Sequence, residues 1–207
     1  MSDVPVNEPA PSWRICGLFG APMPTVAGAV SGVFAERDNY EIGLAGMSFD
    51  EVATGGLPGD RPSVGAFFTS CRRRDGVVML TNQQDGWFTL CNVLARRLDG
   101  CHLRLASSNL PGSQVQSLTV WDDRAEIRHV HVLQDDARWD FMQSGTPLPW
   151  ENVEKYRSRA KRDRLSREML IGYANALGWP IDADGFWSAD GDALWVREKR
   201  PVPGSRC

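Results

Sequence analysis

The sequence predicts an α+β fold, a mostly antiparallel sheet with one face covered by helices near residues 86–98 and 166–177. Three observations lead to this prediction. Residues 77–80 are an apolar run of strand length. Apolar residues recur at helical spacing in both helical segments. Residues 115–133 alternate apolar and polar side chains around a central turn, the pattern of a hairpin with one buried face.

The length of the chain bounds its organisation. With 207 residues, of which 42% are hydrophobic, it can bury one good core. We expect a flexible arm at 1–12, a single α+β domain at 13–200 and a frayed tail at 201–207. Within the domain, a basic connector at 155–165 leads to a C-terminal helical subregion at 166–200.

The first part of the domain has weaker patterns. Residues 13–20 predict a short strand. Residues 26–37 fit a weak helix, because Gly28 and Gly32 each cost about 1 kcal/mol there relative to alanine. A strand at 29–34 is an equal alternative. The elements expected next are a Gly/Pro-rich loop at 53–63 and strands at 64–71 and 77–80.

The segment 86–98 has the clearest helical pattern. Asp85 is expected to cap its N-terminus, and Gly100 to end it in a left-handed conformation. Its buried face is expected to contain Trp87, Leu90, Cys91, Leu94 and Leu98. Cys91 is therefore expected to be a core residue rather than a nucleophile.

Strands are expected at 101–106, 115–121 and 125–133, with a loop at 107–113 and a hairpin turn at 122–124. In the last of these strands, Val130 and Val132 share one face. His129 and His131 share the other, roughly 6 to 7 Å apart. For the helix at 166–177, Ser166 is the expected N-cap and Leu165 is placed to pack on Leu170.

The cysteines and the chain start indicate a compartment. Five widely spaced cysteines without a C-x-x-C pair favour a reducing environment. The N-terminal segment lacks the charged and apolar regions of a signal peptide, and the longest apolar runs are too short for a membrane span. The sequence therefore predicts a cytoplasmic protein without a membrane partner.

No familiar catalytic or nucleotide-binding motif is present in the sequence, so we expect no catalytic residue, no metal and no cofactor. Two alternatives stay open. A metal-dependent enzyme would use His129 and His131, with His102 on a neighbouring strand. A nucleic-acid-binding module would use 155–167, where seven basic residues and one acid give a charge of +6. Since the whole chain carries −3, the remainder carries −9 and would repel a polyanion, which argues against nucleic acid as a partner.

One long passage resembles a known class of proteins. Residues 77–181 contain a helix reading GWFTLCNVLARRL, a strand, a hairpin reading SLTVWDDRAEIRHVHV, the connector GTPLPWE and a helix reading LSREMLIGYANALGWPI. This order resembles immunity proteins of bacterial polymorphic toxin systems, of the type VI or contact-dependent kind.

The resemblance implies a cytoplasmic inhibitor that binds a cognate secreted toxin, in a 1:1 complex, and occludes its active site. The acidic bulk of the chain would suit a basic toxin such as a nuclease through electrostatic steering. We expect the acidic positions Asp122, Asp123, Asp135 and Asp136 to lie near the partner surface.

Overall fold

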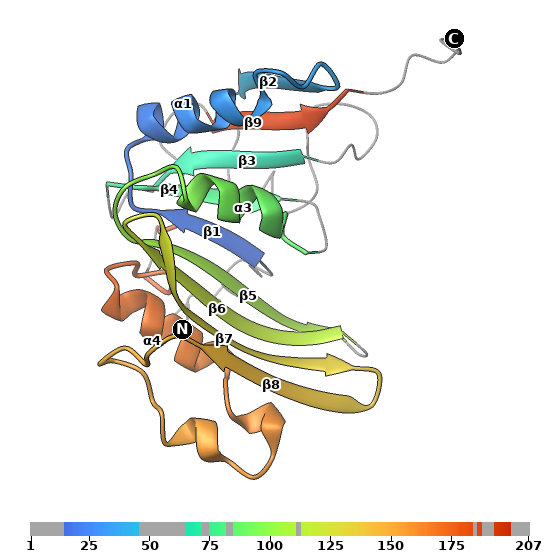
Figure 1. Cartoon of the computed structure of the whole chain (residues 1–207), viewed down its shortest axis with the longest axis vertical. Coiled ribbons are helices and arrows are strands. Elements are labelled where there is room, and N and C mark those ends of the chain that lie inside the picture. The colour runs from blue at the N-terminus through green and yellow to red at the C-terminus, as the bar shows by residue number, and fades with distance from the viewer. Residues whose placement is uncertain are drawn as a thin grey trace, which may run out of the picture.

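The computed structural model describes residues 15–45, 65–71, 75–81, 85–110, 113–183, 186–187 and 193–199. The expected arm at 1–12, loop at 53–63 and tail at 201–207 lie outside these described residues. The described part is a mixed α and β structure that is mostly sheet, which confirms the predicted fold class (Figure 1).

The described strands form one nine-stranded sheet in the order β2-β9-β3-β4-β1-β5-β6-β7-β8. All neighbouring strands are antiparallel. The strands are β1 (Ile15–Phe19), β2 (Tyr40–Ala45), β3 (Gly65–Ser70), β4 (Val77–Thr81), β5 (His102–Leu110), β6 (Ser113–Asp122), β7 (Ala125–Asp135), β8 (Arg138–Ser144) and β9 (Ala193–Glu198). The described helices are α1 (Met23–Phe34), α3 (Phe88–Ala95) and α4 (Arg167–Ala176), with short 3-10 turns η1 (Lys155–Arg157) and η2 (Lys161–Asp163).

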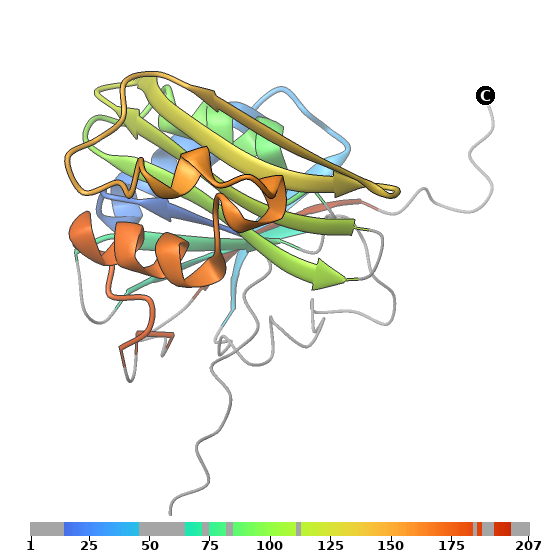
Figure 2. The same ribbon diagram turned by 90° about the horizontal axis from the view of Figure 1, so that it is seen from below.

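The two predicted helices cover opposite faces of the sheet, so the expectation that both lie on one face was wrong. Leu18 belongs to the hydrophobic cluster that contains Leu170 and Ala174 of α4. Its neighbour Phe19 belongs to the cluster that contains α1 and Leu94 of α3. Figures 1 and 2 show α1 and α3 on one side of the sheet and α4 on the other. We call the first side the α3 face and the second side the α4 face.

The reason lies in the central strands. In β3 and β4, successive residues are buried whichever face they point to. A strand that is apolar on both sides needs cover on both sides, as in sheets layered between helices. The cover comes from α1 and α3 on one face and from α4 on the other.

Helix α1 settles the choice between helix and strand at 26–37 in favour of helix. Val26, Val30 and Phe34 are buried at intervals of four residues, which matches one face of a helix. Gly28 and Gly32 are exposed, so their cost is limited to helix propensity.

The two other helices differ in how they begin. Ser166 caps α4, since its side chain accepts a hydrogen bond from the Met169 N–H, as predicted. Asp85 does not cap α3, which was a wrong prediction. The N-cap is Trp87, whose backbone is left-handed with φ 49°, and the Asp85 carboxylate accepts the Trp87 N–H at 2.9 Å instead. Gly86, also left-handed with φ 68°, displaces the helix start past the reach of Asp85.

The expected loop at 107–113 was also wrong. Strand β5 continues to Leu110 and β6 begins at Ser113, so Ser107 pairs with Gln116. Ser107 and Gln116 are both buried, and a buried polar strand pair does not show the apolar alternation that marks a strand in a sequence. None of the described helices combines the length and apolar character that crossing a bilayer needs.

Candidate binding surface on the strands β6 to β8

At the β8 end of the sheet, the α3 face has no described helix over it (Figure 1). Strand register places two rows of side chains there. One row runs from Thr119 to His129 to Ser144, and the next contains His131 opposite Met142. Met142 is 61% exposed, the histidines are half-buried and Thr119 is buried. We call the four side chains that are exposed or half-buried, those of His129, His131, Met142 and Ser144, the open face.

The two histidines of the open face bond to each other. His129 Nε2 lies 2.7 Å from His131 Nδ1, and His129 Nδ1 lies 2.9 Å from the Thr119 hydroxyl. Burial lowers the pKa of His129 to about 4, with further lowering from His131 and Arg104. Burial also lowers the pKa of His131, against the opposing effect of Asp140. Both imidazoles are therefore neutral at pH 7.

The three histidines of the chain do not come together as the metal-dependent alternative requires. His102 is buried on β5, where its Nδ1 accepts the Gly20 N–H and its Nε2 donates to the Leu98 carbonyl, both at 3.2 Å. Its two ring nitrogens are therefore occupied by backbone groups. His129 and His131 each use one ring nitrogen in the hydrogen bond between them. Among the residues that the structure describes, no group of three or more His, Cys, Asp or Glu side chains is placed to hold a metal ion.

The four aspartates expected near a partner form two separate pairs. Asp122 and Asp123 lie at the β6–β7 turn, whose two central residues have positive φ as in a tight hairpin. Asp135 and Asp136 lie at the β7–β8 turn, at the other end of the same strand. All four are exposed. With about 3.3 Å per residue, an eleven-residue strand separates the pairs by roughly 30 Å.

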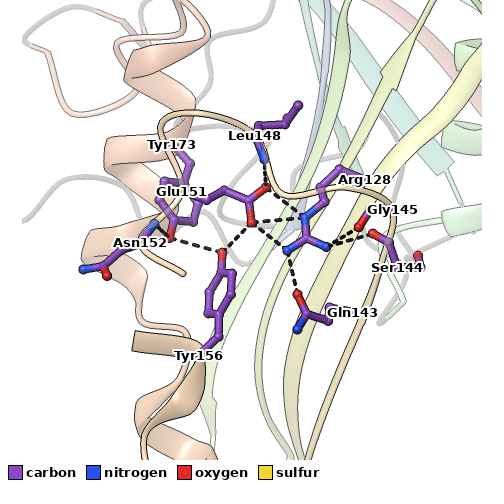
Figure 3. A network of polar contacts seen from close by, with 9 residues as sticks. All are labelled: Arg128, Gln143, Ser144, Gly145, Leu148, Glu151, Asn152, Tyr156 and Tyr173. Atoms are coloured by element: carbon purple, nitrogen blue, oxygen red, sulfur yellow. Dashed lines mark hydrogen bonds and ion pairs between the residues drawn. The ribbon is translucent and has the colours of Figure 1, made fainter. Parts of the chain in front are cut away.

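Behind the open face, on the α4 face, a buried ion pair holds the connector after β8 (Figure 3). The side chains of Arg128 and Glu151 are 0% exposed and are joined by two hydrogen bonds of 2.8 Å. Arg128 also donates to the carbonyls of Ser144 and Gly145 at 3.0 Å and to the Gln143 side chain at 2.8 Å. Such a pair tolerates burial because its hydrogen bonds are satisfied.

Glu151 is the centre of this network. Its carboxylate also accepts the Leu148 N–H and the Tyr156 hydroxyl, each at 2.8 Å. The Tyr156 hydroxyl lies 3.2 Å from that of Tyr173 on α4. Burial, Tyr173 and Glu151 all raise the pKa of Tyr156, so it remains a neutral donor. The network therefore ties the connector, η1 and α4 to the sheet.

Two residues of the GTPLPWE connector thus have structural roles. Glu151 closes the network, and Gly145 has φ +78°. A Cβ atom at position 145 would lie 2.0 Å from the Ile127 carbonyl oxygen. Only glycine, which has no Cβ atom, avoids this clash. The ion pair was not among the sites expected from the sequence. The sequence feature that could have indicated it is Arg128, a charged residue on the same strand face as the apolar Val130 and Val132.

The basic segment forms η1, η2 and their connections, and most of its charged groups have local partners. Ion pairs join Arg157 to Glu154 at 3.1 Å, Lys161 to Asp140 at 2.9 Å and Arg162 to Asp163 at 3.6 Å. Arg164 donates to the Ser158 carbonyl and lies over the Phe141 ring. These contacts hold the segment beside β8 and leave less of its charge for a polyanion.

Comparison with protein-family models, with curated proteins and with solved structures found no match for this chain.

Proposed function

We propose that this chain is a cytoplasmic immunity protein that binds and neutralises a cognate secreted toxin by occluding its active site. The observation that carries the proposal is the open face. It combines an exposed apolar side chain, Met142, with neutral half-buried imidazoles, and acidic turns flank it at both ends of β7. An apolar centre with a charged rim is typical of protein–protein interfaces.

The connector adds support. Gly145 and Glu151 belong to the motif on which the resemblance to immunity proteins depends, and both have defined structural roles here. A motif that fixes the fold of the β7–β8 region is a reason to expect the same arrangement in other chains that carry it. In this chain the connector thereby fixes the end of β8 next to the open face.

The acidic turns favour a basic partner. Asp122 and Asp123 at one end, and Asp135 and Asp136 at the other, are exposed and free to steer a positively charged surface toward the open face. The two turns are too far apart for one side chain of the partner to reach both. A partner that contacts both must span the length of β7.

The proposal predicts a gene for a secreted toxin beside the gene of this chain, and the test is co-purification with the toxin domain that this neighbouring gene encodes. We expect a 1:1 complex by size-exclusion chromatography with light scattering, and loss of toxin activity at equimolar ratio. Met142→Glu should weaken the complex by about ten- to a hundredfold, since a charge at an interface centre is strongly unfavourable. Leu44→Glu is the matched control, because Leu44 is 67% exposed on β2, at the opposite edge of the sheet.

Full inhibition by the Met142→Glu variant would remove the open face from the mechanism. Absence of both complex and inhibition with the wild-type chain would contradict the proposed function itself.

A further inference from the structure

The N-terminus of α3 presents backbone donors that nothing in the described chain satisfies. Helix α3 has eight residues and its N-cap, Trp87, makes no side-chain capping bond. Among the described residues, the N–H groups of Phe88, Thr89 and Leu90 have no acceptor. The first turn also contains no acidic residue. These donors lie at the positive end of the helix dipole and favour an anion.

A buried arginine contacts the first residue of this helix and the loop residue before it. Arg104 on β5 is 8% exposed, and its guanidinium carbon lies 5.0 Å from the centre of the Phe88 ring, the first residue of α3. Its Nη2 donates to the Asp85 carbonyl at 2.6 Å. Its Nε is buried and has no acceptor among the described residues. A buried donor without an acceptor is costly, and more so on a charged group.

The charge of Asp85 favours the charged form of this arginine, but no described side chain forms an ion pair with it. Asp85 is the nearest acid, but its carboxylate accepts the Trp87 N–H and forms no ion pair with Arg104. Burial raises the pKa of Cys91 to about 12, so that thiol is uncharged. Burial lowers the pKa of Arg104, but a guanidinium remains protonated at neutral pH. His129, across Thr119 in the same row, is neutral.

We propose that the first turn of α3 and Arg104 together form a binding site for a carboxylate group. The helix supplies N–H donors, and the guanidinium supplies a positive charge with one donor still without an acceptor. A singly charged carboxylate suits this site better than a phosphate, because a single guanidinium supplies the positive charge and Asp85 lies beside it. The site does not depend on the proposed immunity function.

The test is an NMR titration of the full-length chain with sodium acetate, at constant ionic strength and with chloride as the reference anion. We expect the amide signals of Phe88, Thr89 and Leu90 to shift saturably with acetate and not with chloride. Arg104→Gln should weaken acetate binding at least about tenfold, the range of a charge-assisted hydrogen bond. Arg124→Gln is the matched control, since Arg124 is an exposed arginine paired with Asp99.

A second variant keeps the test valid if Arg104→Gln does not fold. Thr89 is exposed in the first turn of α3, so Thr89→Glu attaches a carboxylate to the helix N-terminus. It should abolish acetate binding and raise the melting temperature, whereas Thr89→Gln should do neither. Equal shifts with chloride and acetate, or acetate binding that survives both Arg104→Gln and Thr89→Glu, would overturn the proposal.

The carboxylate has two possible sources, a small ligand or an acidic side chain of a protein. A short peptide with blocked ends and one glutamate separates them. Binding at least about tenfold tighter than acetate indicates a protein side chain, because neighbouring peptide atoms then add contacts. Equal or weaker binding of the peptide indicates a small carboxylate.

Discussion

The centre of the sheet and its β8 end differ in which faces of their strands are buried. The central strands β3, β4 and β1 are buried on both faces, between α1 and α3 on one side and α4 on the other. Strands β6 to β8 bury apolar residues mainly against the α4 face, and Trp121 near the end of β6 packs in the α3-side cluster instead. The open face carries histidines, a serine and an exposed methionine. The contrast indicates that the two regions differ in how their strands are covered, on both faces at the centre and mainly on one face at the β8 end.

The largest effect is expected from the buried ion pair, which fixes the β8 end to α4. Glu151→Ala leaves Arg128 charged, buried and without its carboxylate, so it should lower the unfolding free energy by about 3–5 kcal/mol. Glu154→Ala removes the acid of an exposed pair and should cost at most about 0.5 kcal/mol. Urea denaturation measures both. Similar small losses for the two variants would mean that the network does not hold the connector.

The next effect compares the two regions directly. Leu94 is fully buried on the inner face of α3, so Leu94→Ala should destabilise by about 2–5 kcal/mol through lost burial and a cavity. Met142→Ala on the open face should change stability by less than about 0.5 kcal/mol. If Met142→Ala proved as destabilising as Leu94→Ala, the open face would be part of the core rather than a surface.

A smaller effect depends on pH and belongs to the β8 end. The pKa of His129 is lowered from 6.5 to about 4, so the unfolded chain binds a proton more readily between these values. The unfolding free energy should therefore fall as the pH drops from 6.5 to about 4, by about 1–2 kcal/mol after allowance for partial exposure. The pKa of His131 is lowered as well and acts in the same direction. His129→Gln should flatten this slope, and an unchanged slope would assign it to other groups.

The last comparison is between two glycines, of which Gly172 gives the smallest expected effect. Gly172 lies exposed in α4 with nothing within 4 Å of an added Cβ, so Gly172→Ala should stabilise by roughly 0.5–1 kcal/mol. Gly145→Ala should instead destabilise, because its backbone is left-handed and the Cβ would meet the Ile127 carbonyl. Thermal melts of the two variants should move in opposite directions.

The sequence predicted the elements with strong periodicity and missed those without it. The helices α3 and α4 and the strands β4, β6 and β7 follow from helical spacing or alternation. Strand β8, Arg138–Ser144, alternates only over its first four residues, because Met142 then lies on the open face and Gln143 on the face of Phe141. Strand β2, Tyr40–Ala45, includes a glycine and an exposed leucine. Their strand character comes from pairing with neighbours, which local patterns do not encode.

The arrangement of the sites was harder to predict than the elements. Periodicity identified buried faces but not which side of the sheet each helix would cover, so α3 and α4 were placed together. The proposed carboxylate site could not be predicted from the sequence for the same reason. Arg104 reads as the polar side of an alternating strand, and only the packing of α3 over that side makes it a buried charge at a helix start.

The charges along β8 have a further consequence for solubility. β8 pairs only with β7 in the described sheet, so its outer backbone groups form an edge that another chain can extend. Asp140 on this strand binds Lys161 of η2, which holds a basic turn against the same edge. A second molecule adding a strand here would have to displace that turn and bury its charges. The ion pair is therefore one obstacle to the addition of a further strand at this edge of the sheet.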